Sequence, residues 1–200
     1  MGWITDVSDL EALYGAPGEA AMRKVARRLT PTYRAWIERS RFCLLATVGP
    51  EGTDCSPRGD DGPVVTELDP GTLAMPDWRG NNRMDTLRNI VRDGRISVTF
   101  LVPGSNTLVR VNGTARVSVD PTLIQRFEQR GQHPRSVIIV QISEIYTQCA
   151  RALMRAGLWD RNDAQGLPTP GEVLAEMTQG EIDGAGYDAA WGARAAETMW

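Results

Sequence analysis

The sequence predicts a mainly β protein of the α+β class, an antiparallel barrel with helices packed against its outside. Two patterns support this prediction. Short apolar runs rich in β-branched residues follow one another across Gly, Pro and Asp turn signals, as the strands of antiparallel hairpins do. Helical segments separate groups of strands instead of following each strand, which argues against a doubly wound parallel sheet. The 200 residues contain no internal repeat.

Strands are expected where apolar runs are bounded by turn residues. Four fall in the first half of the chain, at residues 41–48, 53–57, 64–68 and 72–75. Three follow, at residues 95–102, 107–119 and 136–142, and Ile145 and Tyr146 extend the last of them. In the run TLVRVNGTARV, alternation places Leu108, Arg110 and Asn112 on one face of the strand and Val109 and Val111 on the other.

Helices are expected before, between and after these strands. Residues 1–40 are expected to be helical, and Pro31 marks a restart, because proline is tolerated in a first helical turn. Residues 81–92 carry apolar side chains at helical spacing and predict the next helix. A short helix is expected from Asp120 to Arg130.

We expect a single domain over residues 1–200. Its parts are a helical N-terminal segment at 1–40, a barrel core at about 41–148 and a helical C-terminal extension at about 149–200. Residues 160–200 are rich in Gly, Pro, Ala and acidic residues. Trp191 and Trp200 near their end predict that this tail docks on another surface, such as a second subunit.

Composition narrows the classes of function. Hydrophobic residues make up 42% and charged residues 24%, as in ordinary globular proteins. A net charge of −3 and a pI near 5.3 argue against nucleic acid or an anionic membrane as a partner. No apolar run is long enough to span a bilayer, and the N-terminus lacks a signal pattern, so a cytoplasmic protein is expected.

The scarcity of some reactive residues is equally informative. Cys43, Cys55 and Cys149 show no metal-ligand spacing and are expected to be reduced. One histidine, His133, excludes a multi-histidine metal site within the chain and the usual Ser/His or Cys/His couple. If the protein is an enzyme, we therefore expect a cofactor to carry the chemistry, with no metal site.

The stretch NNRMDTLRN at residues 81–89 predicts an anion site. Asn81, Asn82 and Arg83 would stand in the first turn of a helix, where backbone N–H groups lack partners and the dipole favours anions. The alternative is a capped helix with an exposed arginine, since asparagine is a good cap.

Two further segments could serve the same ligand. In SPRGD at residues 56–60, Ser56 precedes Pro57, which holds its neighbour extended, and Arg58 supplies a planar donor group. A solvated Arg–Asp pair at a surface bend is the alternative. Arg110 projects from a strand and could instead pair with a carboxylate. Trp159 could contact a cofactor or anchor a core or an interface.

The order of these motifs resembles that of a known family. The segments RFCLLATV, SPRGD, PDWRGNNRMDTLRNI, RISVTFLVPG and TLVRVNGTARV are similar to those of the pyridoxamine 5'-phosphate oxidase-like FMN-binding split barrels, over roughly residues 35–160. An uncharacterised branch that also carries a late C-x-x-A-L-x-R-x-x-L-W stretch, here residues 149–159, is most similar. The resemblance implies a six-stranded antiparallel split barrel and a homodimer with FMN at the subunit interface.

The resemblance also implies a set of cofactor-binding residues. Ser56 and Arg58 would lie near the phosphate or the ring, and Pro76 and Asp77 at the isoalloxazine edge. The phosphate clamp would fall on Asn81, Asn82 and Arg83. Arg110 would reach the cofactor from the partner subunit. Pro57 and Trp159 complete the set.

Two departures separate this chain from the authentic oxidase. Asn82-Arg83 stands where that enzyme has an Arg-Lys pair, which leaves one cation instead of two. The tail has no counterpart of its substrate-binding motif with arginine and histidine, so vitamin B6 is not the expected substrate.

The sequence therefore predicts a homodimeric FMN-binding flavoprotein, an oxidoreductase acting on an unidentified small molecule. Arg58 is the candidate charge near the flavin N1–C2=O edge or the phosphate. No residue is assigned as a catalytic acid or base. The alternatives are a deazaflavin-dependent reductase of the same fold, a non-enzymatic flavin-binding or redox-sensing module, and a haem-handling relative.

Overall fold

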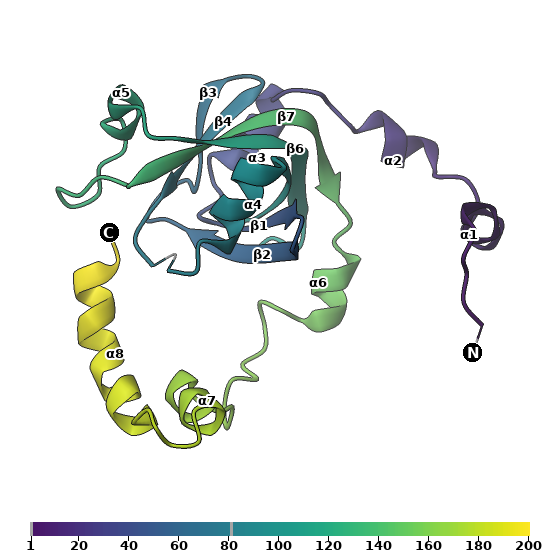
Figure 1. Ribbon diagram of the computed structural model, residues 1–200. Coiled ribbons are helices and arrows are strands. Elements are labelled where there is room, and N and C mark those ends of the chain that lie inside the picture. The colour runs from purple at the N-terminus through teal and green to yellow at the C-terminus, as the bar shows by residue number, and fades with distance from the viewer. Residues whose placement is uncertain (1, 81) are drawn as a thin grey trace.

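A computed structural model describes residues 2–80 and 82–200 (Figure 1). In this part of the chain, the strands are β1 (Phe42–Gly49), β2 (Gly52–Gly59), β3 (Thr66–Asp69), β4 (Thr72–Asp77), β5 (Arg95–Leu101), β6 (Leu108–Ser118) and β7 (Ser136–Gln148). The helices are α1 (Val7–Tyr14), α2 (Glu19–Arg23), α3 (Pro31–Ile37), α4 (Asp85–Arg92), α5 (Pro121–Ile124), α6 (Arg151–Ala156), α7 (Pro170–Met177) and α8 (Gly184–Thr198).

The strands form one curved antiparallel sheet in the order β2-β1-β5-β6-β7-β4-β3. Its two edges, β2 and β3, do not pair with each other, so the barrel stays open on one side (Figure 1). The predicted antiparallel split barrel is therefore confirmed. The sheet contains seven strands, which is the number that the residue pattern predicts. The resemblance implies six, and that number is wrong. The short edge strand β3 pairs only with β4, across a Pro-Gly turn.

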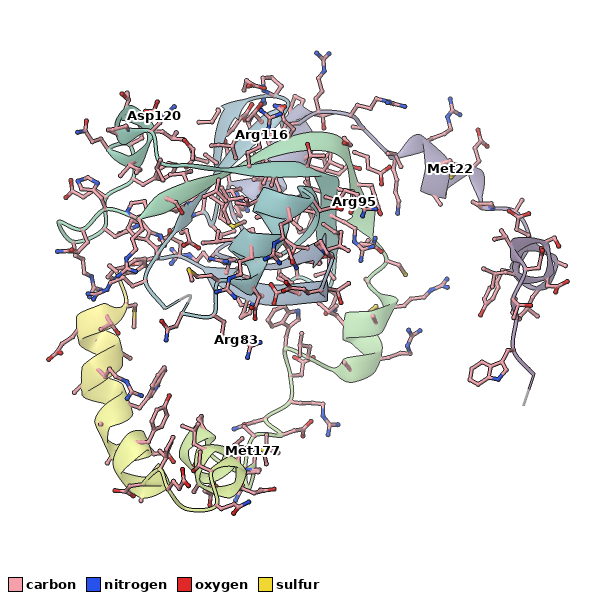
Figure 2. All side chains as sticks on the ribbon, in the orientation of Figure 1. Met22, Arg83, Arg95, Arg116, Asp120 and Met177 are labelled. Carbon is pink, nitrogen blue, oxygen red and sulfur yellow. The ribbon has the colours of Figure 1, made fainter. Side chains whose placement is uncertain are left out.

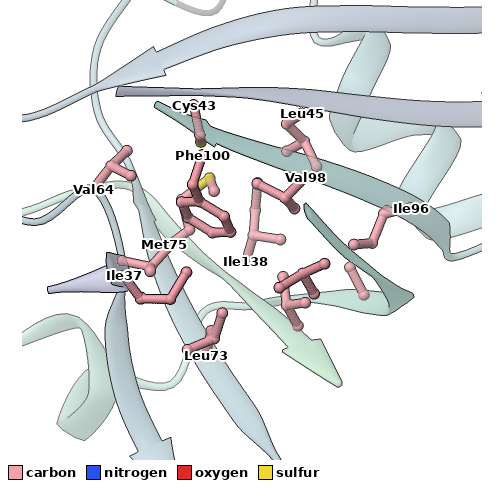
Figure 3. Packing of buried hydrophobic residues seen from close by; sticks show 14 of the residues in the cluster. Ile37, Cys43, Leu45, Val64, Leu73, Met75, Ile96, Val98, Phe100 and Ile138 are labelled. Carbon is pink, nitrogen blue, oxygen red and sulfur yellow. The ribbon is translucent and has the colours of Figure 1, made fainter. Parts of the chain in front are cut away.

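The core follows from alternation along the strands. On β1, Cys43 and Leu45 are fully buried, whereas Phe42 and Leu44 on the other face are each 38% exposed. Figure 3 shows how the inward side chains of β1, β4, β5 and β7 surround Phe100. One face of the sheet thus encloses the core, and the opposite face carries partly exposed apolar side chains.

Two glycines permit close contacts that fix the sheet. The register of β6 on β7 shifts between Asn112 and Gly113, and a Cβ on Gly113 would lie 1.9 Å from the Gln141 carbonyl oxygen. A Cβ on Gly49 would lie 2.2 Å from Oδ1 of Asn89. Asn89 is buried on α4, and its Nδ2 donates to Oγ1 of Thr47 at 3.1 Å. This packing holds α4 against β1, beside β2.

Two predicted helix boundaries are wrong. Helix α4 begins at Asp85 and not at residue 81, because Met84 adopts a left-handed conformation with φ 60° that cannot continue a helix. Helix α5 ends at Ile124 instead of Arg130. In the first 40 residues, α2 and α3 are separate because an extended segment pairs Ala26 with Ile145.

The tail folds into a helical hairpin that returns to the barrel. Helices α7 and α8 approach so closely that a Cβ on Gly171 would lie 2.1 Å from the Gly184 carbonyl oxygen. After α8, the chain comes back toward the barrel (Figure 1), where Trp200 packs edge-to-face on Trp78 with ring centroids 5.4 Å apart. Trp191 is 55% exposed. None of the described helices is both long and apolar enough to cross a membrane.

We expect the Cys43 thiol to be inert in the folded protein. Its side chain has no exposed surface, and this burial raises the pKa of the thiol to about 12, so it carries almost no thiolate at neutral pH. In a variant with Cys55→Ser and Cys149→Ser, Ellman's reagent should leave Cys43 unmodified until denaturant is added. Rapid reaction of the native variant would contradict the described core. The Cys43→Ser and Cys55→Ser variant, which retains the exposed Cys149, is the reactive control.

Candidate functional site

A cavity lies at the open side of the barrel, between the end of β2 and the loop that follows β4. Its volume is about 360 Å³, within the range of small-ligand sites. The lining combines a flat apolar surface with cationic and acidic groups: Ser56, Pro57, Arg58, Gly59, Asp60, Val64, Pro76, Trp78, Arg79 and Gly80. We call this space the seam cavity.

A buried ion pair crosses the opening at this point. Nη1 of Arg58 on β2 lies 2.5 Å from Oδ1 of Asp77 on β4, and the two side chains are 11% and 8% exposed. These strands are first and sixth in the sheet order, so no backbone ladder joins them. The ion pair links the two sides of the barrel where the sheet does not.

Two nitrogens of the Arg58 guanidinium make hydrogen bonds, and the third makes none with the described residues. Its Nε donates to Oγ of Ser56 at 3.3 Å, while Nη2 is buried and has no hydrogen-bond partner within the described residues. An unpaired buried donor costs about 1–3 kcal/mol. A ligand acceptor in the seam cavity would recover that cost.

A chain of hydroxyl hydrogen bonds supports the same arginine. Oγ of Ser56 lies 2.9 Å from Oγ1 of Thr86, which is buried on α4 and donates in turn to the Asp54 carboxylate. Alternation places Asp54, Ser56 and Arg58 on one face of β2. Packing of α4 on the barrel therefore sets the position of the guanidinium.

The far wall of the cavity is also fixed by hydrogen bonds. Nε1 of Trp78 donates to Oδ2 of Asp60 at 2.8 Å, and Nε2 of Gln129 donates to Oδ1 of the same residue at 3.0 Å. Asp60 thus joins the end of β2 to the loops after β4 and α5, and it fixes the indole ring of Trp78.

A second cavity of about 300 Å³ lies at the other end of β2, and we call it the polar cavity. It is lined by Glu51, Gly52, Thr53, Asp54, Arg83, Asp85, Arg88 and Asn89. Nε of Arg83 pairs with Oδ2 of Asp85 at 2.7 Å, and this hydrogen bond raises the pKa of Arg83. The Arg83 side chain is 88% exposed and extends from the edge of the barrel (Figure 2).

The structure brings some of the predicted site residues together. Ser56, Pro57, Arg58 and Pro76 line the seam cavity, and Asp77 pairs with Arg58 beside it.

Other predicted site residues lie elsewhere. Arg83 lines the polar cavity and, with Asn82, stands in the loop before α4 and not in its first turn; this prediction is wrong because Met84 delays the helix. Asn81 lies outside the described residues. Trp159 lines neither cavity, and its Nε1 donates to the Ser105 carbonyl oxygen at 2.9 Å.

Arg110 lies on the outward face of the sheet, away from the core. It is paired in register with Thr99 on β5 and Tyr146 on β7, and Thr99 faces Leu44 on β1. Its Nε is buried and, in the described part of the chain, has no hydrogen-bond partner. Leu44, Thr99, Arg110 and Tyr146 thus form a row across the sheet. We call the surface formed by this row and its neighbours Phe42 and Leu108 the outer face.

Sequence reasoning missed four residues of the site. Asp60 and Arg79 belong to the SPRGD and PDWRG motifs, but Asp60 was considered only as the partner of a solvated ion pair and Arg79 was given no role. Thr86 acts through a buried contact between α4 and β2, which needs the tertiary structure. Trp78 is recognisable only because its ring is fixed by a residue 18 positions away.

The fold and the cavity place the protein in a general class, the antiparallel split barrels with an arginine-lined cavity at the open side. The sequence profile described as pyridoxamine 5'-phosphate oxidase matches residues 29–149, more than half of the chain. The chain belongs to the pyridoxamine 5'-phosphate oxidase family, so the family prediction is confirmed.

Solved structures of similar fold are distant in sequence. HupZ from Group A Streptococcus is 19% identical with a TM-score of 0.50, over 60% of this chain and 93% of that chain. A Lactobacillus delbrueckii protein described as a pyridoxamine 5'-phosphate oxidase candidate is 23% identical with a TM-score of 0.48, over 60% of this chain and 95% of that chain. The likeness to HupZ supports the fold alone. No curated protein sequence matches the chain.

We expect Asp77→Asn to lower the free energy of unfolding by about 3 kcal/mol, because it leaves the buried Arg58 cation without its counter-charge. Urea denaturation followed by circular dichroism measures the change. The double variant Arg58→Met with Asp77→Asn should recover most of the loss, since no uncompensated charge remains.

The matched control is Asp163→Asn. Asp163 pairs with Arg161 at 2.6 Å, but both side chains are more than 60% exposed. This change should cost only about 0–1 kcal/mol. Equal losses for Asp77→Asn and Asp163→Asn would show that the ion pair across the opening is not a structural constraint.

Proposed function

We propose that the protein is an FMN-binding oxidoreductase that acts on a small molecule. The observation that carries this proposal is Nη2 of Arg58, a buried donor without a partner in the described part of the chain, at a cavity that can take a flat ring. Membership of the pyridoxamine 5'-phosphate oxidase family supports it.

The seam cavity fits the ring of a flavin. Pro57, Pro76 and Trp78 give it an apolar surface for a planar system, and Arg58 gives one edge a fixed positive charge. Bound flavin would supply hydride acceptance and donation at N5. Arg58, held by Asp77 and Ser56, would stabilise negative charge at the N1–C2=O edge with little reorganisation.

We place the phosphate at the polar cavity, near Arg83. Both cavities lie along β2, and Gly80 lines one of them while Arg83 lines the other. Arg83 is free to exchange partners, because an exposed salt bridge such as that with Asp85 contributes only about 0–1 kcal/mol. Phosphate would have to replace Asp85, since the cavity already holds three carboxylates against two arginines.

We further propose a homodimer formed through the outer face. Phe42 and Leu44 leave apolar surface exposed there, and the unpaired Nε of Arg110 lies in the same face. An acceptor from a second copy or from its cofactor would satisfy this donor. Haem as the cofactor is less well supported than flavin. The lining of the seam cavity contains no histidine, and Nδ1 of His133 makes a hydrogen bond with the Phe127 carbonyl oxygen.

Binding of FMN and riboflavin to two arginine variants tests the cofactor and its orientation. Arg58→Gln should weaken the binding of both FMN and riboflavin, because Arg58 is placed at the flavin ring that they share. Arg83→Ala should weaken FMN by roughly ten- to hundredfold and riboflavin little, since a charge-assisted contact to phosphate contributes about 1.5–3 kcal/mol. Flavin fluorescence titration measures the four affinities.

The control for these variants is Arg116→Gln, an exposed arginine of β6 that lines neither cavity and lies well away from Arg83 (Figure 2). It should leave both affinities unchanged. If Arg58→Gln weakens FMN alone, the phosphate lies at Arg58 and the orientation is reversed. If no flavin binds, the proposal fails. The mass of any cofactor released from purified protein separates FMN from a deazaflavin, and turnover with a reductant and an acceptor separates an enzyme from a binding module.

We expect Leu44→Asp to dissociate the dimer, because it places a charge in the apolar part of the outer face. Sedimentation should show a shift from dimer to monomer, and FMN affinity should fall with it, since a ligand bound by the dimer favours the dimer. Cys55 on β2 faces the same side in register and should become more reactive with Ellman's reagent in this variant.

The matched control for Leu44→Asp is Val119→Asp, which adds the same charge at a residue that is 71% exposed beyond the end of β6. It should not change the oligomeric state. A wild-type monomer with full FMN occupancy would remove the two-subunit site from the proposal.

A further inference from the structure

We propose that the cleft lined by Trp78 and Trp200 binds an aromatic anion and is the substrate subsite beside the cofactor. The second part of this proposal rests on the proposed flavin function; the first does not. The tail at residues 160–200 would then act in the site through the ring of Trp200, although its sequence shows no binding motif.

The cleft is large enough for a small molecule and adjoins the seam cavity. Its volume is about 530 Å³, and it is lined by Gly59, Asp60, Asp61, Trp78, Arg79, Arg130, Met199 and Trp200. Gly59, Asp60, Trp78 and Arg79 also line the seam cavity. A molecule in the cleft would therefore lie next to a ligand in the seam cavity.

Two indole rings give the cleft its preference for aromatic ligands. The planes of Trp78 and Trp200 meet at 88°, so the rings form a right-angled corner. The Trp78 ring is held by its hydrogen bond to Asp60 and offers a fixed wall. A planar ligand against one indole would meet the other in the edge-to-face geometry that aromatic pairs prefer.

The two carboxylates of the cleft already have partners. Asp60 already accepts hydrogen bonds from Trp78, Gln129 and the backbone of Asp61, and Asp61 pairs with Arg41 at 3.1 Å.

The two arginines of the cleft, in contrast, are not committed. Arg79 and Arg130 have no ion pair with any described residue. Asp60 is engaged by three hydrogen bonds, whereas Asp61 is held only by an exposed salt bridge and keeps a charge that opposes an anion. Arg79 and Arg130 outnumber Asp61 and favour an anionic group on the ligand.

The Trp200 ring carries an unused donor. Its Nε1 is buried and has no hydrogen-bond partner in the described part of the chain. Buried indole N–H groups are usually paired. An acceptor on the ligand, such as a carboxylate oxygen, would satisfy this donor and stabilise the returned position of the tail.

Calorimetric titration with 2-naphthoate tests the cleft, with 2-naphthamide as the neutral probe and cyclohexanecarboxylate as the non-aromatic anion. We expect 2-naphthoate to bind at least tenfold more tightly than either. Trp200→Ala should weaken it about tenfold, equivalent to about 1.4 kcal/mol. This variant removes the last side chain of the tail and leaves the barrel core intact. Arg79→Gln and Arg130→Gln should weaken 2-naphthoate but not 2-naphthamide.

Two matched controls separate the cleft from general binding. Trp191→Ala removes an exposed indole of α8 that does not line the cleft, and Arg155→Gln removes an exposed arginine of α6. Neither should change the affinity for 2-naphthoate. Equal affinity in Trp200→Ala and Trp191→Ala, or no preference for 2-naphthoate over the other two probes, would overturn the aromatic-anion site.

The failure of this proposal can be distinguished from failure of the flavin proposal. The titrations are made with protein before and after saturation with FMN. If 2-naphthoate binds as described but FMN does not, the aromatic-anion site stands and its role as a subsite beside flavin is overturned. If both bind, 2-naphthoate should shift the visible absorption bands of FMN in wild type and not in Trp200→Ala. FMN spectra that do not respond would overturn the adjacency.

Discussion

The buried ion pair between Arg58 and Asp77 is the constraint on which the site depends. In the hydrogen-bonded sheet, β2 and β4 are connected only through the four strands that lie between them, β1, β5, β6 and β7. Across the open side the two strands are joined by side chains, and this pair is the charged link. A buried ion pair adds little net stability, but the loss of one partner is costly, so its main effect is to fix geometry. The geometry that it fixes is that of the seam cavity.

Three arginines illustrate how burial separates structural from binding roles. Arg58 and Arg110 each keep a buried nitrogen unpaired within the described chain, one at the seam cavity and one on the outer face. Arg83 is exposed and already paired with Asp85. A buried donor is expensive to leave unpaired, so the first two predict a missing acceptor. An exposed guanidinium predicts none, and its assignment to phosphate depends on position alone.

The sequence was sufficient to predict seven strands close to their observed positions, because alternation and turn residues are local signals. It also identified Arg58 and Asp77, but it separated them into different roles, since their pairing depends on strands far apart in the chain. The start of α4 was placed at residue 81, too early in the chain, because the left-handed conformation of Met84 delays the helix. Only the backbone reveals that conformation. Trp200 could not be placed, because its position depends on the return of the whole tail.

The edge-to-face contact between Trp78 and Trp200 has a kinetic consequence. An edge-to-face pair contributes about 0.5–1.5 kcal/mol beyond the area that it buries. Taken alone, this geometric part favours the packed ring over a released one by only about two- to thirteenfold, so the rest of the hold on Trp200 must come from the area that its ring buries. Trp200 stays tethered through α8, so a released ring remains at a high local concentration and recloses quickly. Exchange of small molecules at the cleft would then depend on motion of the residues that follow α8 and not on opening of the barrel.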